Sequence, residues 1–178
     1  VVVIVVLVLL GVYYVVAGHR APSALDAGIA AYTAGHRDSA RAYFARAAAA
    51  APSNALPHLY LGRMAREDGD YTTAGKELRT AVQLDPSGAA AQRELGAFFL
   101  ARGGTFASES RPDLASQDYD AARRAYVRAI QVDASDTASE GYLACALARL
   151  GRADEAATWL KRAGPGPWSS CASSPAAP

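Results

Sequence analysis

Residues 55–88 read ALPHLYLGRMAREDGDYTTAGKELRTAVQLDPSG. Apolar residues recur at helical spacing on both sides of Gly69-Asp70, and glycine tolerates the left-handed conformation required just past a helix end. The stretch closes on Asp85-Pro86, and the residue before a proline avoids helical angles. These 34 residues therefore predict a helix, a short turn and a second helix.

The same spacing recurs along the chain. Residues of one class return after 34 positions at Gly28, Gly62 and Gly96, at Gly35 and Gly69, at Ala40 and Ala74, and at Pro52 and Pro86. Beyond Gly103 the pattern returns only after 48 residues, so 14 extra residues lie between Gly103 and Ala122. Such a period indicates a stack of repeated units. Four units follow: 21–54, 55–88, 89–136 with an insertion at 104–117, and 137–163.

Each residue class has a physical reason. Small residues such as Gly62 and Ala74 are expected where two helices cross, since larger side chains would separate the axes. The glycines expected to end the first helices are Gly35, Gly69, Gly103 and Gly151. Ala134 replaces the proline at the end of the third unit and predicts a softer boundary. Within the insertion, residues 110–113 (SRPD) predict a turn, because Pro112 breaks a continuous helix. We expect a loop that either contacts a partner or is a tolerated addition.

The pattern resembles the tetratricopeptide repeat. The resemblance rests on Leu61-Gly62, Ala65, Gly69-Asp70-Tyr71, Ala74, Leu78, Ala81 and Pro86, and on the return of the pattern in four units. It implies an all-α, right-handed superhelical solenoid whose first helices line a concave surface that binds proteins. It also implies a protein that holds partners, with no catalytic activity, cofactor or small-molecule substrate.

The phase of the repeat predicts which residues face this concave surface. We expect the partner-binding groove to include Leu59, Arg63, Arg66, Arg93, Leu100, Tyr142 and Arg149, with Ala97 and Cys145 beside them. Arginine pairs with a carboxylate through two parallel hydrogen bonds, so the groove suits a peptide or helix that carries a carboxylate. The alternative is that these arginines are ordinary solvated side chains. A clamp of lysine and asparagine found in some relatives is absent here, where the matching positions hold Leu25, Ile29, Tyr60, Ala90 and Glu94.

The C-terminal end of the array lacks an obvious polar cap. Residues 164–178, GPGPWSSCASSPAAP, are rich in Pro, Gly and Ser and predict a disordered tail. The last helix then exposes Trp159 and Leu160, which with Trp168 form a predicted C-terminal interface. The alternative is that Trp168 folds back and covers that helix.

The N-terminal residues, VVVIVVLVLLGVYYVVA, carry no charge. We expect residues 1–18 to be a transmembrane helix, since a helix of 17 residues extends about 26 Å toward the roughly 30 Å of a hydrocarbon core. Cleavage after Ala17 as a signal peptide is the rival, and a buried globular segment is the third possibility. The predicted location is a single-pass protein of a bacterial inner membrane. Arg20 favours a cytoplasmic repeat domain and the layout of relatives a periplasmic one, so the orientation stays open.

Composition and motifs exclude several functions. A net charge of +1, with arginines scattered among carboxylates, gives no argument for nucleic acid. The motifs G-x-S-x-G, G-x-x-x-x-G-K and H-E-x-x-H are absent from the sequence, and its histidines and two cysteines have no metal-ligand spacing. We therefore expect a membrane-anchored adaptor for assembly of a membrane or envelope complex. The alternative is a permanent accessory subunit of a larger membrane complex.

Overall fold

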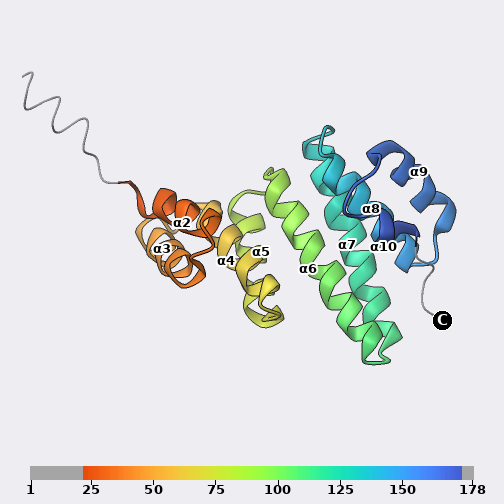
Figure 1. The fold of residues 1–178 in the computed structure, drawn as a ribbon, viewed down its shortest axis with the longest axis horizontal. Coiled ribbons are helices and arrows are strands. Elements are labelled where there is room, and N and C mark those ends of the chain that lie inside the picture. The colour runs from red at the N-terminus through yellow and green to blue at the C-terminus, as the bar shows by residue number, and fades with distance from the viewer. Residues whose placement is uncertain (1–21, 174–178) are drawn as a thin grey trace, which may run out of the picture. The chain divides into compact units, whose positions relative to one another are not determined.

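The computed structural model describes residues 22–173, and within them every regular element is a helix. The helices are α2 (Ala24–Thr33), α3 (Arg37–Ala50), α4 (Ala55–Glu67), α5 (Tyr71–Leu84), α6 (Ala89–Ser108), α7 (Pro112–Val132), α8 (Thr137–Arg149), α9 (Ala153–Ala163) and α10 (Ser169–Ser173) (Figure 1). The chain divides into two compact units between Ala47 and Ala48, so the described residues 22–47 belong to the first and 48–173 to the second. From α4 to α9 each helix packs on the next, as stacked hairpins do.

The predicted membrane helix, residues 1–18, lies outside the described residues. Among residues 22–173, no helix combines the length and the apolar character needed to cross a bilayer.

Glycines end the first helix of three hairpins, as their spacing predicts. Gly35, Gly69 and Gly151 have φ angles of 77°, 78° and 75°. At Gly69 the amide donates to the carbonyl of Arg66 at 3.0 Å, and the amide of Asp70 donates to that of Ala65 at 2.9 Å. These bonds satisfy carbonyls that the helix leaves without partners, and a residue with a side chain would be strained at such a φ.

The small residues at 34-residue intervals lie where the two helices of a hairpin touch. A Cβ atom added at Gly62 would stand 2.6 Å from Cγ of Leu78, and one at Gly28 would stand 2.7 Å from the ring of Phe44. Each of these glycines therefore lets a large side chain of the second helix lie against the backbone of the first. The predicted reason for the period is confirmed.

The insertion differs from the expected loop. It lengthens both helices of its hairpin, because α6 and α7 have 20 and 21 residues, against 13 and 14 in α4 and α5. Each helix thus gains seven residues, or about two turns. Gly103, expected to end the first helix, lies inside α6 instead. The turn moves to Ser110, whose φ of 57° and flanking hydrogen bonds (Ser110 to Ala107, Arg111 to Phe106) repeat the arrangement at Gly69.

Contacts between α6 and α7 hold this long hairpin together. Arg102 donates to both carboxylate oxygens of Asp118 at 2.7 Å, and Asp118 is 5% exposed. The ring of Tyr119 covers Gly103, where an added Cβ would stand 2.8 Å from it. The two extra turns of each helix are therefore packed structure. The turn predicted at residues 110–113 is found at Ser110 and Arg111, but a loop over the rest of the insertion was wrong, because local turn signals do not show that a helix resumes beside its partner.

The boundary at Ala134 is as well defined as the one at Pro86. Asp85 and Asp133, the residues that follow α5 and α7, share extended angles, φ −134° and −132°. In both turns an Asp carboxylate accepts from the amide and the hydroxyl of the serine two residues later. The aspartate turn stops the helix without proline, so the softer boundary predicted there is not found.

The C-terminal tail also differs from the prediction over its described part. Residues 169–173 form α10, which packs on α8, and Trp168 is only 8% exposed. The indole lies over Gly141 and donates from Nε1 to the carbonyl of Gly164 at 3.0 Å. It also meets the ring of Tyr142 edge-on, with 5.7 Å between the ring centroids. Trp168 therefore folds back as a cap, and it does not contribute to an exposed interface.

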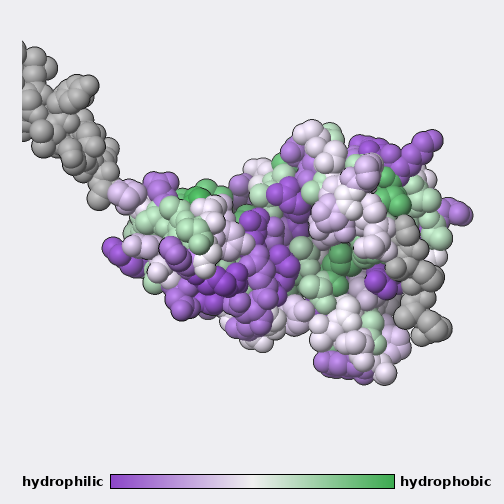
Figure 2. Space-filling view, in the orientation of Figure 1, coloured by the Kyte–Doolittle hydropathy of each residue, from purple (hydrophilic) through white to green (hydrophobic). Residues whose placement is uncertain are grey.

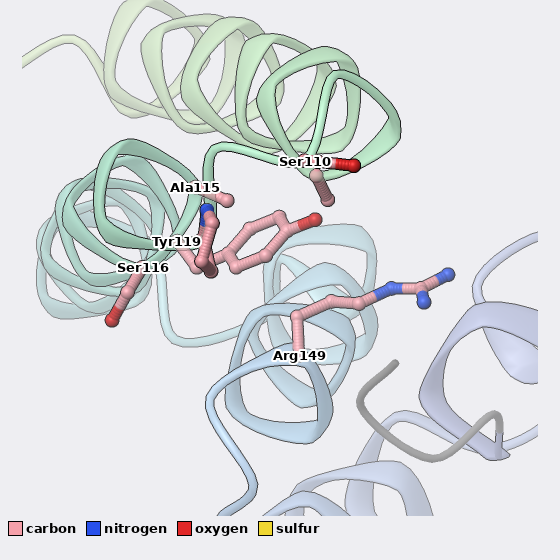
Figure 3. Close-up of a pocket in the computed structure, with 7 residues that line it drawn as sticks. Ser110, Ala115, Ser116, Tyr119 and Arg149 are labelled. Atoms are coloured by element: carbon pink, nitrogen blue, oxygen red, sulfur yellow. The ribbon is translucent and has the colours of Figure 1, made fainter. Parts of the chain in front are cut away.

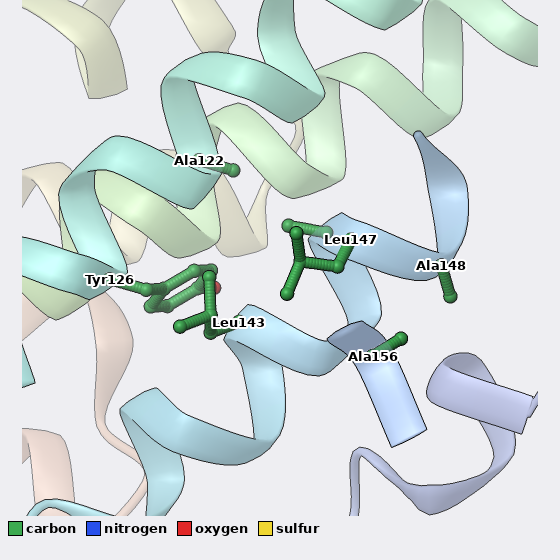
Figure 4. Packing of buried hydrophobic residues seen from close by; sticks show 7 residues of the cluster. Ala122, Tyr126, Leu143, Leu147, Ala148 and Ala156 are labelled. Atoms are coloured by element: carbon green, nitrogen blue, oxygen red, sulfur yellow. The ribbon is translucent and has the colours of Figure 1, made fainter. Parts of the chain in front are cut away.

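The core beneath this cap joins three helices. Tyr126 and Ala122 of α7 meet Leu143, Leu147 and Ala148 of α8, and Ala156 of α9 completes the cluster (Figure 4). Trp159, predicted at an exposed end, packs against this cluster. The apolar face that argued for docking through the C-terminal end is thus partly covered by the protein itself, whereas Leu160 is half-buried and lines an open cavity beside Gly164 and Pro165.

Candidate functional site: a groove along α6

The groove cavity, of about 350 Å³, lies between the first helices of successive hairpins. Its lining comes from α4 (Arg66), α6 (Arg93, Glu94, Ala97, Leu100 and Ala101) and the α8 hairpin (Ala138 and Tyr142). Four of the seven predicted groove residues, Arg66, Arg93, Leu100 and Tyr142, meet here. The volume is in the range of binding pockets, and the shape is open, as an extended ligand requires.

Glu94 lines the groove cavity and pairs with two of the predicted groove arginines. Glu94 is 7% exposed, and its two carboxylate oxygens lie 2.7 Å from Nη2 of Arg63 and 3.5 Å from Nη2 of Arg66. Beneath it lies Tyr126, whose pKa is raised well above its usual value, mainly by burial and then by the charge of Glu94. Two predicted carboxylate binders thus already share a carboxylate of the protein, and only the tertiary structure brings Glu94 to them.

Arg93 is also engaged. It donates to Asp136 at 2.8 Å, and Asp136 caps the start of α8 by accepting from the amide of Ser139 at 3.1 Å and from its hydroxyl at 2.7 Å. Arg93 therefore ties α6 to the first turn of α8. Each of Arg63, Arg66 and Arg93 therefore already pairs with a carboxylate of a neighbouring hairpin, and binding of a partner's carboxylate by these residues stays a prediction.

Leu59, predicted to line the groove, and Cys145, expected beside it, are both in the core. Leu59 is 4% exposed and packs with Ala81 and Ala91, and Cys145 is fully buried on α8. Both positions have the right helical phase, but Ala81 and Ala91 of α5 and α6 pack on Leu59, and the C-terminal tail lies against Cys145. The helical phase of a residue does not show whether it lies in the contact between two hairpins or on the open surface beside that contact.

Two further cavities continue the groove along α6. The middle cavity, of about 250 Å³, shares Leu100 and Ala101 with the groove cavity and adds Gly104, Ala107, Tyr119, Arg149 and Cys171. The tip cavity, of about 470 Å³, shares Ala107, Tyr119 and Arg149 with the middle one and adds Ser110, Pro112, Ala115 and Ser116. The insertion therefore forms one wall of this extension.

Arg149, the last predicted groove residue, lies at this extension. Figure 3 shows it on α8 and Tyr119 on α7, with the tyrosine hydroxyl directed toward Ser110. Burial raises the pKa of Tyr119 and the charge of Arg149 opposes that rise. Over residues 22–173 we find no carboxylate within ion-pairing distance of Arg149.

Sequence spacing gave no sign that Cys145 and Cys171 come together. Cys145 on α8 donates from Sγ to the carbonyl of Trp168 at 3.3 Å, and Cys171 is on α10, three residues after that tryptophan. The interaction of the two thiols, aided by Arg149, lowers the pKa of Cys171 to about 7. The same interaction together with burial raises the pKa of Cys145. Because residues 164–178 were expected to be disordered, nothing in the sequence indicated that Cys171 lies beside Cys145.

The surface matches a protein-binding function. Figure 2 shows hydrophilic residues over much of α4 and α5, and hydrophobic residues exposed among the helices from α6 to α8. Within the described part of the chain, no cluster of His, Cys, Asp or Glu is arranged to hold a metal ion. The arrangement offers an open, partly apolar channel with paired charges at one end and Arg149 near the other.

Comparison with known proteins identifies the family. The tetratricopeptide repeat pattern matches residues 25–89 and 113–168, which is more than half of the chain. The chain therefore belongs to the tetratricopeptide repeat family, and its fold is the helical solenoid of that family. The unmatched residues 90–112 hold most of α6 and part of the insertion, where the 34-residue period is broken. No curated protein matches the chain.

Solved structures agree on the fold. A thermophilic tetratricopeptide repeat protein of Thermus thermophilus, TTC0263, superposes with a TM-score of 0.67 at 22% identity, over 79% of this chain and 71% of that one. MamA AMB-1 gives a TM-score of 0.57 at 22% identity, over 79% and 69%. The O-GlcNAc transferase of Thermobaculum terrenum gives 0.62 at 23% identity, over 78% of this chain but only 25% of that enzyme. At these identities the likeness concerns the fold alone.

Proposed function

We propose that this protein is a membrane-anchored adaptor that holds an extended segment of a partner protein in the groove along α6. Three connected cavities carry the proposal: they follow one helix and share lining residues from each to the next. The family supports a role in protein–protein interaction. The uncharged residues 1–18 support an anchor that places the groove beside a membrane, where assembly of a membrane or envelope complex would use it.

The groove is best tested by filling it. Ala97 and Ala101 are one turn apart on α6, and both are partly exposed toward the groove cavity. Replacing both (Ala97→Gln with Ala101→Gln) keeps good helix formers and adds bulk where the partner would lie. Reversing the charges of Arg63, Arg66 and Arg93 would be a poor test, because it would set carboxylates against Glu94 and Asp136 and break contacts between hairpins.

The measurement is recovery of partners with tagged full-length protein from its native membranes in mild detergent, quantified by mass spectrometry. We expect the filled groove to reduce partner recovery about tenfold, which corresponds to roughly 1.4 kcal/mol of binding energy. The matched control is Ala153→Gln, at an exposed position of α9 outside the three cavities, and it should leave recovery unchanged. Equal recovery with the filled groove would refute the proposal.

The same experiment separates the adaptor from an accessory subunit. A subunit would be recovered in fixed stoichiometry with a single complex, whereas an adaptor would carry a substoichiometric set of partners. The subunit interpretation depended on residues 1–18 and on an exposed C-terminal face, and the burial of Trp168 makes that face smaller.

A further inference from the structure

The insertion in the third hairpin builds a wall that the regular repeat does not have. The insertion places Ala107 of α6, Ser110 of the turn and Ala115 of α7 around the tip cavity. These small side chains leave space beside the ring of Tyr119. A 14-residue addition that packs this closely, with Arg102 and Asp118 paired across it, is a rigid part of the surface.

The length of the channel suits an extended chain. Arg93 lines one end and Ala107 the other, and both are on α6. Fourteen residues of helix span about 21 Å. An extended peptide covers that distance with about six residues. A small metabolite would occupy only one of the three cavities.

The charges along the channel differ between its ends. At the α4 end, Glu94 and Asp136 already neutralise the arginines. At the insertion end, Arg149 faces a surface of alanines, Tyr119 and Cys171, with no carboxylate of residues 22–173 paired to it. Arg149 stabilises negative charge there, since it contributes to the lowered pKa of Cys171. The site is therefore complementary to an anion supplied by the ligand.

We propose that the channel binds an extended segment of a partner protein with an Asp or Glu side chain at the insertion end, where Arg149 pairs with that carboxylate and Tyr119 packs beside it. This inference rests on the proposed groove function and names the chemistry of its ligand. Arg149 lines both the tip and the middle cavity, so a chain that occupies both continues past it. An internal acidic side chain therefore fits this channel, in preference to a terminal carboxylate.

The test is selection from a phage-displayed library of random peptides on the full-length protein, immobilised in mild detergent. We expect wild type to enrich peptides with Asp or Glu at one fixed position, near apolar residues. Arg149→Gln should enrich the apolar positions without the acidic one. The matched control, Arg128→Gln, removes an exposed arginine of α7 outside the three cavities and should keep the acidic preference.

A deletion separates the insertion from the rest of the channel. Removing residues 104–117 joins Gly103 to Asp118-Tyr119 and recreates the Gly-Asp-Tyr turn found at residues 69–71. The shortened hairpin should therefore fold, as circular dichroism can check, and it should select a shorter motif without acidic preference. If it does not fold, the comparison of Arg149→Gln with Arg128→Gln still decides the question.

Binding of an enriched peptide gives the quantitative test. Fluorescence anisotropy should show about tenfold weaker binding when its acidic residue becomes Gln or Asn, because a hydrogen-bonded charge pair is lost. The same change should have little further effect on Arg149→Gln. Peptides with free and amidated C-termini should bind equally, and a preference for the free end would contradict an internal carboxylate.

The other outcomes distinguish the two proposals. A shared motif without acidic preference in wild type, or an acidic preference that persists in Arg149→Gln, would overturn this inference and leave the groove function standing. If neither the wild type nor any variant enriches a motif, both the groove function and this inference are overturned. A change of oligomeric state in Arg149→Gln would assign the cavity to a second copy of the chain and would also overturn the inference.

Discussion

At the scale of single residues, environment separates groups that the sequence presents as alike. Cys145 and Cys171 are chemically identical, but one is buried in α8 and the other lines the middle cavity. Arg63, Arg66, Arg93 and Arg149 share a helical phase, but only the first three have carboxylates at 3.5 Å or less. The residues that contact these arginines and thiols come from another hairpin or from the C-terminal tail, and they decide the charge and reactivity of each side chain.

The lowered pKa of Cys171 leads to a prediction about its reactivity. The thiolate is the nucleophile, so alkylation by iodoacetamide should rise as the pH passes through about 7, well below the value for an ordinary cysteine. Mass spectrometry of the alkylated peptide, followed against pH, measures this profile. Cys145 should stay unmodified in the folded protein because it is fully buried and its pKa is raised.

The variant Cys145→Ala tests the cause. The lowered pKa depends first on the interaction with the Cys145 thiol, so removing it should move the alkylation profile of Cys171 to higher pH. Arg149→Gln should move it in the same direction by a smaller amount. A profile centred near the ordinary thiol value in the wild-type protein would show that the two thiols do not interact.

At the scale of elements, the C-terminal cap depends on one small residue of α8. A Cβ added at Gly141 would stand 2.1 Å from Cδ2 of Trp168 and 2.3 Å from Cγ, so the indole would have to move. We expect Gly141→Ala to displace Trp168 and α10 and to destabilise the protein by about 2 kcal/mol, as overpacking of a buried site does. Urea unfolding would measure the loss, and a red shift of Trp168 fluorescence in a Trp159→Phe background would show the displacement.

Gly104→Ala is the matched control. Gly104 is an exposed position inside α6, and an added Cβ meets nothing within 4 Å. The same substitution there should stabilise the protein by about 0.5–1 kcal/mol, because alanine is the better helix former. If both variants lose stability equally, glycine to alanine has a general effect and Trp168 is not packed on Gly141 in solution.

At the scale of the whole molecule, the prediction concerns the anchor. Residues 1–18 are uncharged and apolar, so the full-length protein should stay in the membrane pellet after washing with alkaline carbonate. A variant without residues 1–18 should appear in the supernatant, which gives the control. Release of the full-length chain, with a new N-terminus after Ala17, would favour the cleaved signal peptide instead.

The sequence by itself determined the repeat, the family and most helix boundaries. These features depend on local rules: glycine ends a helix, a small residue marks a crossing, and an aspartate turn or proline stops a helix. Each acts within a few residues or at a fixed period, so spacing is enough to find it. The groove could be placed on the first helices for the same reason, and Arg66, Arg93, Leu100 and Tyr142 do line it.

Only the tertiary structure decided what each groove residue can do. Three contacting pairs are far apart in sequence. Glu94 lies 28 residues after Arg66, Asp136 lies 43 residues after Arg93, and Trp168 lies 23 residues after Cys145, whose thiol donates to its carbonyl. Such contacts depend on how hairpins stack, and a helical phase does not specify which residue of the next hairpin stands opposite. For the same reason the insertion lengthened α6 and α7 by about two helical turns each and formed one wall of a new cavity. Packing against a neighbouring helix stabilises helical turns that local signals leave open.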